Sequence, residues 1–151
     1  MSLFQGVYGL VLRNQTISGA HELFEVTAPS DRSVTILRAT LSLATSTTPL
    51  DEIVETDMGV VTVSGNGTAK TPQPFNPNYA AVAATATGDG TTGPTLSPVF
   101  IGEGFHAQQG FRYLPLPEER PVFAGSDVFG WRIPSAITSS NWTWTLVFGV
   151  G

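Results

Sequence analysis

Apolar and polar positions alternate along this chain with a period of two, most clearly toward its C-terminal end. Residues 141–150 and residues 127–133 each place their large apolar side chains on one face. Successive side chains of a strand point to opposite sides of a sheet, so this alternation predicts two strands. Turn residues occupy positions 134–140 between them, and we therefore expect an antiparallel hairpin. The hairpin carries the three tryptophans of the chain, which we expect in the core: Trp131, Trp142 and Trp144.

Shorter runs of the same kind fill the rest of the chain, separated by turns that contain Gly, Pro or Asn. We expect a β-bulge at Gly59 and a hairpin turn at residues 64–67, Ser-Gly-Asn-Gly. The alanine-rich residues 79–87 fit a short helix by propensity, but Thr85 and Thr87 favour a strand. The further strands predicted in this way span residues 7–12, 23–27, 34–44, 53–63, 99–109 and 111–114.

Many short strands without internal repeats or a linker are typical of an all-β antiparallel sandwich, and we expect a jelly-roll-like one. A chain of 151 residues is long enough for one such domain and too short to favour two. We expect the domain over residues 10–151, preceded by an N-terminal arm over residues 1–9. Residues 71–77 predict a surface loop, because their three prolines lack the N–H that a central strand needs.

Charged residues make up only 13% of the chain, about half of the usual quarter for a soluble domain. Either uncharged polar side chains cover the surface, or part of the surface is buried in an oligomer or a larger assembly. The net charge of −5 and the single lysine, Lys70, argue against a nucleic-acid partner, which requires a basic surface. We find no signal peptide and no apolar run of the roughly 20 residues that a membrane span needs. We therefore expect a protein made in the cytoplasm, with neither a membrane nor a nucleic acid as its partner.

Few residues suggest catalysis or metal binding. His21 and His106 are too few for a zinc site in a chain without cysteine. Glu52, Glu55 and Asp57 form an acidic cluster that calcium or a glycosidase could use, but their spacing favours a solvated acidic face. The sequence contains no nucleophile elbow, phosphate-binding loop or dinucleotide fingerprint. We expect no catalytic residue, no metal ion and no cofactor.

Apolar side chains on the N-terminal arm and on the proline-rich loop are the candidates for binding another protein, and the aromatic residues among them are of the type that dominates interfaces. We call these five residues the expected anchors: Leu3, Phe4, Val7 and Tyr8 at the N-terminus, and Phe75 on the proline-rich loop. The three tryptophans could alternatively form a sugar-stacking platform, but their spacing is that of core residues.

Two segments resemble small all-β proteins encoded among the virion genes of tailed bacteriophages. Residues 13–32, Arg-Asn-Gln-Thr-Ile-Ser-Gly-Ala-His-Glu-Leu-Phe-Glu-Val-Thr-Ala-Pro-Ser-Asp-Arg, are similar to an early segment of those proteins. Residues 113–121, Tyr-Leu-Pro-Leu-Pro-Glu-Glu-Arg-Pro, followed by the tryptophan-containing strands, are similar to their C-terminal third. Some members resemble capsid decoration, or cement, proteins, which sit as jelly-roll trimers on the outer shell.

The resemblance implies a structural virion protein on the capsid exterior, without enzymatic activity. Such a protein would bind the major capsid protein as a homotrimer and would stabilise the shell by bridging neighbouring capsid subunits. The alternative is a carbohydrate-binding β-sandwich module of a phage tail or host-attachment protein, for which the tryptophans would supply the sugar platform.

Overall fold

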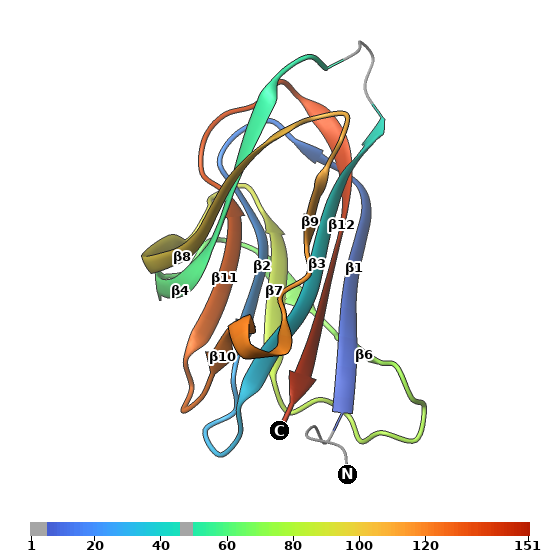
Figure 1. Ribbon diagram of the computed structural model, residues 1–151, viewed down its shortest axis with the longest axis vertical. Helices are drawn as coiled ribbons and strands as arrows, with labels where there is room; N and C mark the ends of the chain where they lie inside the picture. The colour runs from blue at the N-terminus through green and yellow to red at the C-terminus, as the bar shows by residue number, and fades with distance from the viewer. Residues whose placement is uncertain (1–5, 46–49) are drawn as a thin grey trace.

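The computed structural model describes residues 6–45 and 50–151, which form two antiparallel sheets packed face to face (Figure 1). One sheet has the order β10-β3-β12-β1-β6, and β9 pairs with β3 beside β10. Its strands are β1 (Gly6–Ile17), β3 (Val34–Thr45), β6 (Gln73–Pro74), β9 (Phe111–Tyr113), β10 (Val122–Phe123) and β12 (Ser140–Val150). The other sheet has the order β5-β7-β2-β11-β4-β8. Its strands are β2 (His21–Thr27), β4 (Ile53–Val63), β5 (Thr68–Lys70), β7 (Thr85–Gly90), β8 (Thr95–His106) and β11 (Val128–Ile133).

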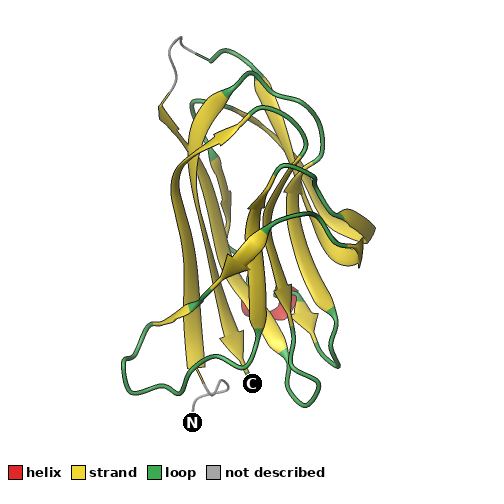
Figure 2. Ribbon diagram, turned by 180° about the vertical axis from the view of Figure 1, so that it is seen from behind, coloured by secondary structure: helices red, strands yellow, loops and turns green. Residues whose placement is uncertain are grey.

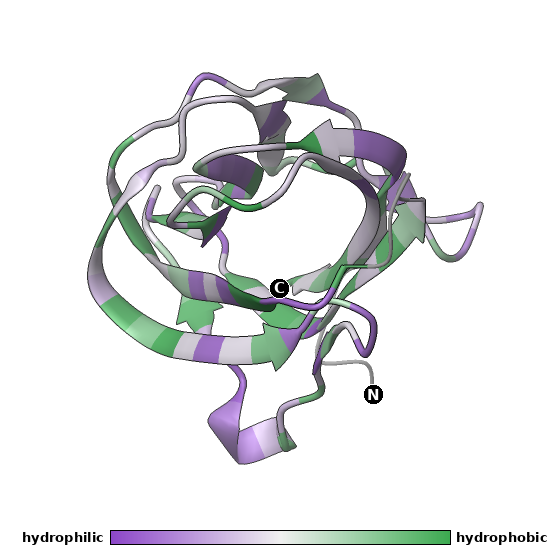
Figure 3. Cartoon of the chain, turned by 90° about the horizontal axis from the view of Figure 1, so that it is seen from above, coloured by the Kyte–Doolittle hydropathy of each residue, from purple (hydrophilic) through white to green (hydrophobic). Residues whose placement is uncertain are grey.

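The expected all-β class and the single antiparallel sandwich are confirmed, whereas the finer jelly-roll class stays a prediction. Figure 2 shows the two layers from behind, together with the one helical turn in the described residues, the 3₁₀ helix η1 (Pro117–Glu119). Seen from above, the two sheets curve around a common interior (Figure 3). The strand β4 has the bounds that the alternation predicts, and its pairing with β8 shifts register on both sides of Gly59, where we expect the bulge.

The three tryptophans lie in the core as predicted, but not in a hairpin. β11 pairs with β2 and β4 in one sheet, while β12 pairs with β1 and β3 in the other. The expected hairpin is therefore wrong, and residues 134–139 cross from one sheet to the other. Alternation predicts which face of a strand is buried, but it carries no information on which strand lies beside it. The two apolar faces meet across the sandwich, and all three indole rings are fully buried.

Each buried indole N–H has an acceptor. Nε1 of Trp131 donates to Thr56 Oγ1 at 2.8 Å, Nε1 of Trp142 to Ser140 Oγ at 2.9 Å, and Nε1 of Trp144 to the Leu23 carbonyl oxygen at 3.1 Å. Such pairing avoids the cost of a buried donor without a partner. The tryptophans are thus satisfied core residues, and none of them is exposed as a sugar-stacking surface.

The first strand is longer than the sequence predicts, which moves the start of the domain. β1 begins at Gly6, which lies opposite Val150, and it pairs with β12 along its length. Residues 6–9, assigned to an arm from the sequence, are therefore part of the sheet. Tyr8 stacks on Phe148 with 5.9 Å between ring centroids, and its hydroxyl donates to the Ala80 carbonyl oxygen at 2.9 Å.

Residues 64–67 are not the expected hairpin turn. β4 precedes them and pairs with β11 and β8, whereas β5 follows them and pairs with β7. The strands on either side of this connection are therefore not neighbours in the sheet. The alanine-rich residues 79–87 enter a strand only at Thr85, where β7 begins, and residues 79–84 precede it as irregular chain.

Candidate functional site

The most unusual polar feature of the sandwich is a pair of glutamates buried on one strand. Glu22 and Glu25 of β2 have exposed fractions of 0% and 5%. Residues three apart in a regular strand point to opposite faces. Here, however, the Thr87 hydroxyl donates to Glu22 Oε2 at 2.9 Å, and Thr87 lies directly opposite Glu25 in β7. Both carboxyl groups are therefore on the same face, the one that points away from the core residues of β2.

A β-bulge in β2 explains this arrangement. Phe24 pairs with Trp131 of β11, and Glu22 pairs with the next residue of β11, Arg132. Leu23 is thus the extra residue, and its insertion turns Glu22 to the side of Glu25. Bulges commonly re-aim a side chain in this way beside functional sites.

Residues 64–67 lie over the two carboxyl groups and supply backbone donors to them. Gly65 N–H donates to Glu25 Oε2 at 2.8 Å, and Gly67 N–H donates to Glu22 Oε1 at 3.2 Å. A Cβ atom at either glycine would collide with a carboxylate oxygen of Glu22. The close approach of the connection to the glutamates therefore requires glycine at both positions.

Burial raises the pKa of Glu22 from 4.5 to about 7, and a hydrogen bond with the side chain of Glu25 and repulsion from its charge act in the same direction. The hydrogen bonds that Glu22 accepts from Thr87 and Gly67 lower the pKa, with a smaller combined effect. Below neutral pH the pair therefore holds a shared proton.

The arrangement of the pair is suited to holding a proton rather than to hydrolysis. The two carboxyl groups of a glycosidase stand roughly 5–9.5 Å apart and flank the substrate. Those of Glu22 and Glu25 are hydrogen-bonded to each other, and the cavity beside them measures only about 120 Å³. The sequence provides no signal for this pair, because two glutamates three positions apart predict opposite faces unless the bulge is known.

The histidines and acidic residues singled out from the sequence have separate surroundings. His21 Nε2 lies 2.8 Å from Asp89 Oδ1, and His106 Nε2 lies 2.9 Å from Asp51 Oδ1. No three His, Asp or Glu side chains within the described ranges are arranged to hold a metal ion.

The three acidic residues that we expect to share one solvated face also have separate surroundings. Glu52 accepts hydrogen bonds from the backbone N–H and the hydroxyl of Thr138, and Asp57 forms an ion pair with Arg132 at 3.0 Å. Glu55 is exposed, as a solvated side chain should be. The three carboxylates thus do not form one site.

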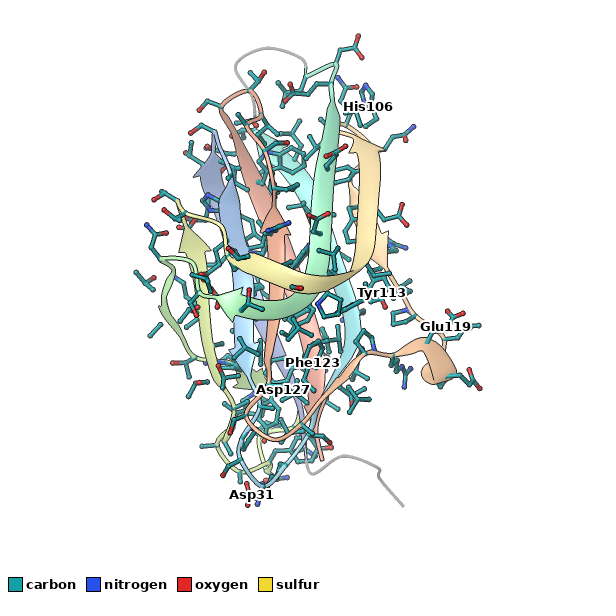
Figure 4. All side chains as sticks on the ribbon, turned by 90° about the vertical axis from the view of Figure 1, so that its left-hand side faces the viewer. Asp31, His106, Tyr113, Glu119, Phe123 and Asp127 are labelled. Carbon is teal, nitrogen blue, oxygen red and sulfur yellow. The ribbon has the colours of Figure 1, made fainter. Side chains whose placement is uncertain are left out.

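A second candidate site is an apolar surface around the segment that carries η1. Figure 4 shows this segment projecting from the sandwich, with Glu119 near its tip and Tyr113 and Phe123 at its base. The exposed fractions of Leu114, Leu116 and Val122 are 59%, 62% and 62%, and Phe100 of β8 is also exposed. We call Leu114, Leu116 and Val122, together with the neighbouring Phe100, the 114–122 surface.

A groove of about 330 Å³ has two residues of the 114–122 surface, Phe100 and Val122, in its lining. Apolar side chains line it, with two carboxylates among them: Val60, Phe100, Pro121, Val122, Phe123, Glu119 and Asp127. The groove has the mixed character of a protein-binding surface, an apolar floor with charged groups beside it. The sequence gives no sign of this groove, because the prolines at positions 115, 117 and 121 indicate only a loop.

Of the five expected anchors, Phe75 alone is largely exposed in the described part of the chain, at 58%. It lines a groove of about 310 Å³ beside β1. Val7 is partly buried in β1, and Tyr8 is buried in the core of its own chain. Leu3 and Phe4 lie outside the described residues.

The chain matches no known family model, no curated protein and no solved structure. In residues 6–45 and 50–151, no helix is long and apolar enough to cross a membrane.

Proposed function

We propose that this chain is a structural virion protein of a tailed bacteriophage, which binds the outer capsid shell and bridges neighbouring major capsid subunits. The observation that carries the proposal is the 114–122 surface, with three apolar side chains about 60% exposed on a segment that projects from the sandwich. The same segment, residues 113–121, is one of the two that resemble phage virion proteins.

The exposed apolar side chains supply a physical reason to dock. Apolar surface contributes roughly 25 cal/mol per Å² when it leaves water, so burying Leu114, Leu116 and Val122 would contribute about 3–5 kcal/mol before ordering costs. The sandwich behind them is a rigid frame, because its aromatic core is fully buried and its indole donors are paired. A rigid frame reduces the entropy that docking costs.

In this proposal the protein acts without catalysis on the capsid exterior, as a homotrimer. Three linked copies would raise the strength of attachment far above that of one copy, because the second and third contacts form at high effective concentration. Sedimentation equilibrium of the purified protein at micromolar concentration should then show about three times the 16.0 kDa monomer mass. A monomer alone at that concentration would contradict a preformed trimer.

The carbohydrate-binding alternative loses its main support. It requires tryptophan rings on the surface, and Trp131, Trp142 and Trp144 are fully buried. We therefore do not propose it as a second function.

The test is attachment to particles of the virus whose genome encodes the chain, assembled with this gene deleted. We expect the added protein to co-sediment with the particles and to appear as density on the shell in cryo-EM. The triple variant Leu114→Thr, Leu116→Thr, Val122→Thr should bind at least about 30-fold more weakly, a loss of about 2 kcal/mol.

The matched control replaces three apolar residues that are exposed elsewhere on the sandwich. The control variant is Val11→Thr, Ile53→Thr, Val63→Thr, at positions 49%, 66% and 62% exposed. It should bind as the wild type does. Equal weakening by the two triple variants would reject the 114–122 surface as the docking site, and absence of the protein from purified particles would reject the virion role.

A further inference from the structure

We propose that the connection at residues 64–67 is a pH-dependent latch, closed over the Glu22–Glu25 pair while the pair holds its shared proton and released when that proton is lost to water. The release would free the edge strand β5, which directly follows the connection. The latch and the 114–122 surface share no residue, so the latch would act whether or not the protein binds a capsid.

The latch is defined by its contacts. It contacts β2 through two hydrogen bonds. The Gly65 N–H donates to Glu25, and the Gly67 N–H donates to Glu22. Between them, Asn66 Oδ1 accepts a hydrogen bond from Thr92 N–H at 2.8 Å, which ties the connection to the turn after β7. Within the described residues, these two N–H groups make the only hydrogen bonds between the latch and the carboxyl groups.

Neighbouring charges do not neutralise the pair. Arg132 lies beside Glu22 in the sheet, but its guanidinium donates to Asp57 Oδ2 at 3.0 and 3.2 Å and to the Pro94 carbonyl oxygen at 2.8 Å. His21, next to Glu22 in β2, is paired with Asp89 of β7.

Lys70 ends β5, which is separated from β2 by β7 in the sheet. Among the described residues, no lysine, arginine or histidine forms an ion pair with either glutamate of the latch. A second negative charge in the pair would therefore be opposed only by the hydrogen bonds from Gly65, Gly67 and Thr87.

Two adjacent buried carboxylates repel each other and lack the water that would solvate them. Opening of the connection admits water and removes both costs, so deprotonation favours the open form. The pKa of about 7 for Glu22 in the closed form places this change near neutral pH. Lys70 also lines the groove that holds Phe75, so release of β5 would alter that groove.

Hydrogen–deuterium exchange of residues 64–70, measured on the whole protein and corrected for intrinsic rates, tests the proposal. If the open form has the ordinary pKa of 4.5, the opening constant should rise about 30-fold between pH 5.5 and pH 8.5. The ¹³C shift of the Glu22 side-chain carboxyl in the wild type should titrate with a midpoint near 7.

The variant Glu22→Gln imitates the protonated form, because its amide can donate to Glu25 and accept from Gly67. It should keep residues 64–70 protected at both pH values. Glu55→Gln, at an exposed position of β4, is the control and should retain the wild-type pH dependence. Exchange in the wild type that does not change with pH, or an unchanged pH dependence in Glu22→Gln, would overturn the latch. If Glu22→Gln fails to fold, exchange in Glu25→Gln and the wild-type carboxyl titration replace it. An unchanged pH dependence in Glu25→Gln, or a Glu22 midpoint at the ordinary 4.5, would overturn the latch.

Discussion

The indole Nε1 of Trp131 donates a hydrogen bond to Thr56 Oγ1, 2.8 Å away, and both side chains are fully buried. The Thr56 hydroxyl in turn donates to the carbonyl oxygen of Arg132, also at 2.8 Å. Thr56 thus accepts a hydrogen bond from the only polar atom of the Trp131 side chain and links it to the backbone of β11.

Replacing Thr56 with valine should therefore destabilise the protein although the volume of the side chain is kept. The change leaves the Trp131 N–H buried without an acceptor, which costs about 1–3 kcal/mol. Urea unfolding followed by tryptophan fluorescence measures this loss. Thr62→Val is the matched control, because the exposed Thr62 hydroxyl makes only a long hydrogen bond of 3.3 Å to Thr95. Equal and small losses in both variants would contradict the role assigned to Thr56.

Truncation of Trp142 to alanine should cost about 3–5 kcal/mol, because it removes a fully buried ring and leaves a cavity. The ring packs edge-on against Phe105 with 6.1 Å between centroids, so that contact is lost as well. The same unfolding experiment provides the measurement. A loss below about 1 kcal/mol would place the ring outside the core.

The Glu22–Glu25 pair should make the protein less stable as the pH rises toward neutrality. The folded-state pKa of Glu22, about 7, is above the ordinary value of 4.5, so the folded state binds more protons than the unfolded state between these values. The stability that the pair contributes is fully present below about pH 4.5 and is lost as the pH rises through about 7.

The size of this effect follows from the shift in pKa and amounts to about 3 kcal/mol over the whole range. The unfolding free energies of the wild type and of Glu22→Gln should be measured between pH 4.5 and pH 8. The difference between the two variants gives the contribution of the Glu22 titration to stability. The difference should change with pH in the stated direction. A constant difference would show that Glu22 titrates alike in both states.

Removal of residues 1–5 should leave the sandwich folded, because the pairing of β1 with β12 begins at Gly6. If Leu3 and Phe4 anchor the protein, the truncated chain should occupy fewer sites on particles that lack the protein, at limiting concentration. Its melting temperature should equal that of the full chain. Full occupancy by the truncated chain would remove these two residues from the proposed interface.

Local pattern alone located many of the strands and their buried faces, although β1 and β8 have other bounds than predicted. β4 has the bounds that its alternation predicts, and Trp142 and Trp144 point into the core from the face that the period assigns to them. The physical reason is that the two-residue period of a strand is a property of consecutive residues. The buried face can therefore be identified directly from the alternation of apolar residues in the sequence.

The tertiary structure decided which strands are neighbours and what covers them. β11 and β12 follow each other in the chain but lie in different sheets, and the apolar face of each strand points into the interior between the two sheets. The extra residue Leu23 turns Glu22 toward Glu25, and the glycines at 65 and 67 close over the pair from a segment about 40 residues away. These relationships arise from packing between distant segments, and no local period records them. The sequence therefore predicted the sandwich, whereas the carboxyl pair and the 114–122 surface emerged only from the folded chain.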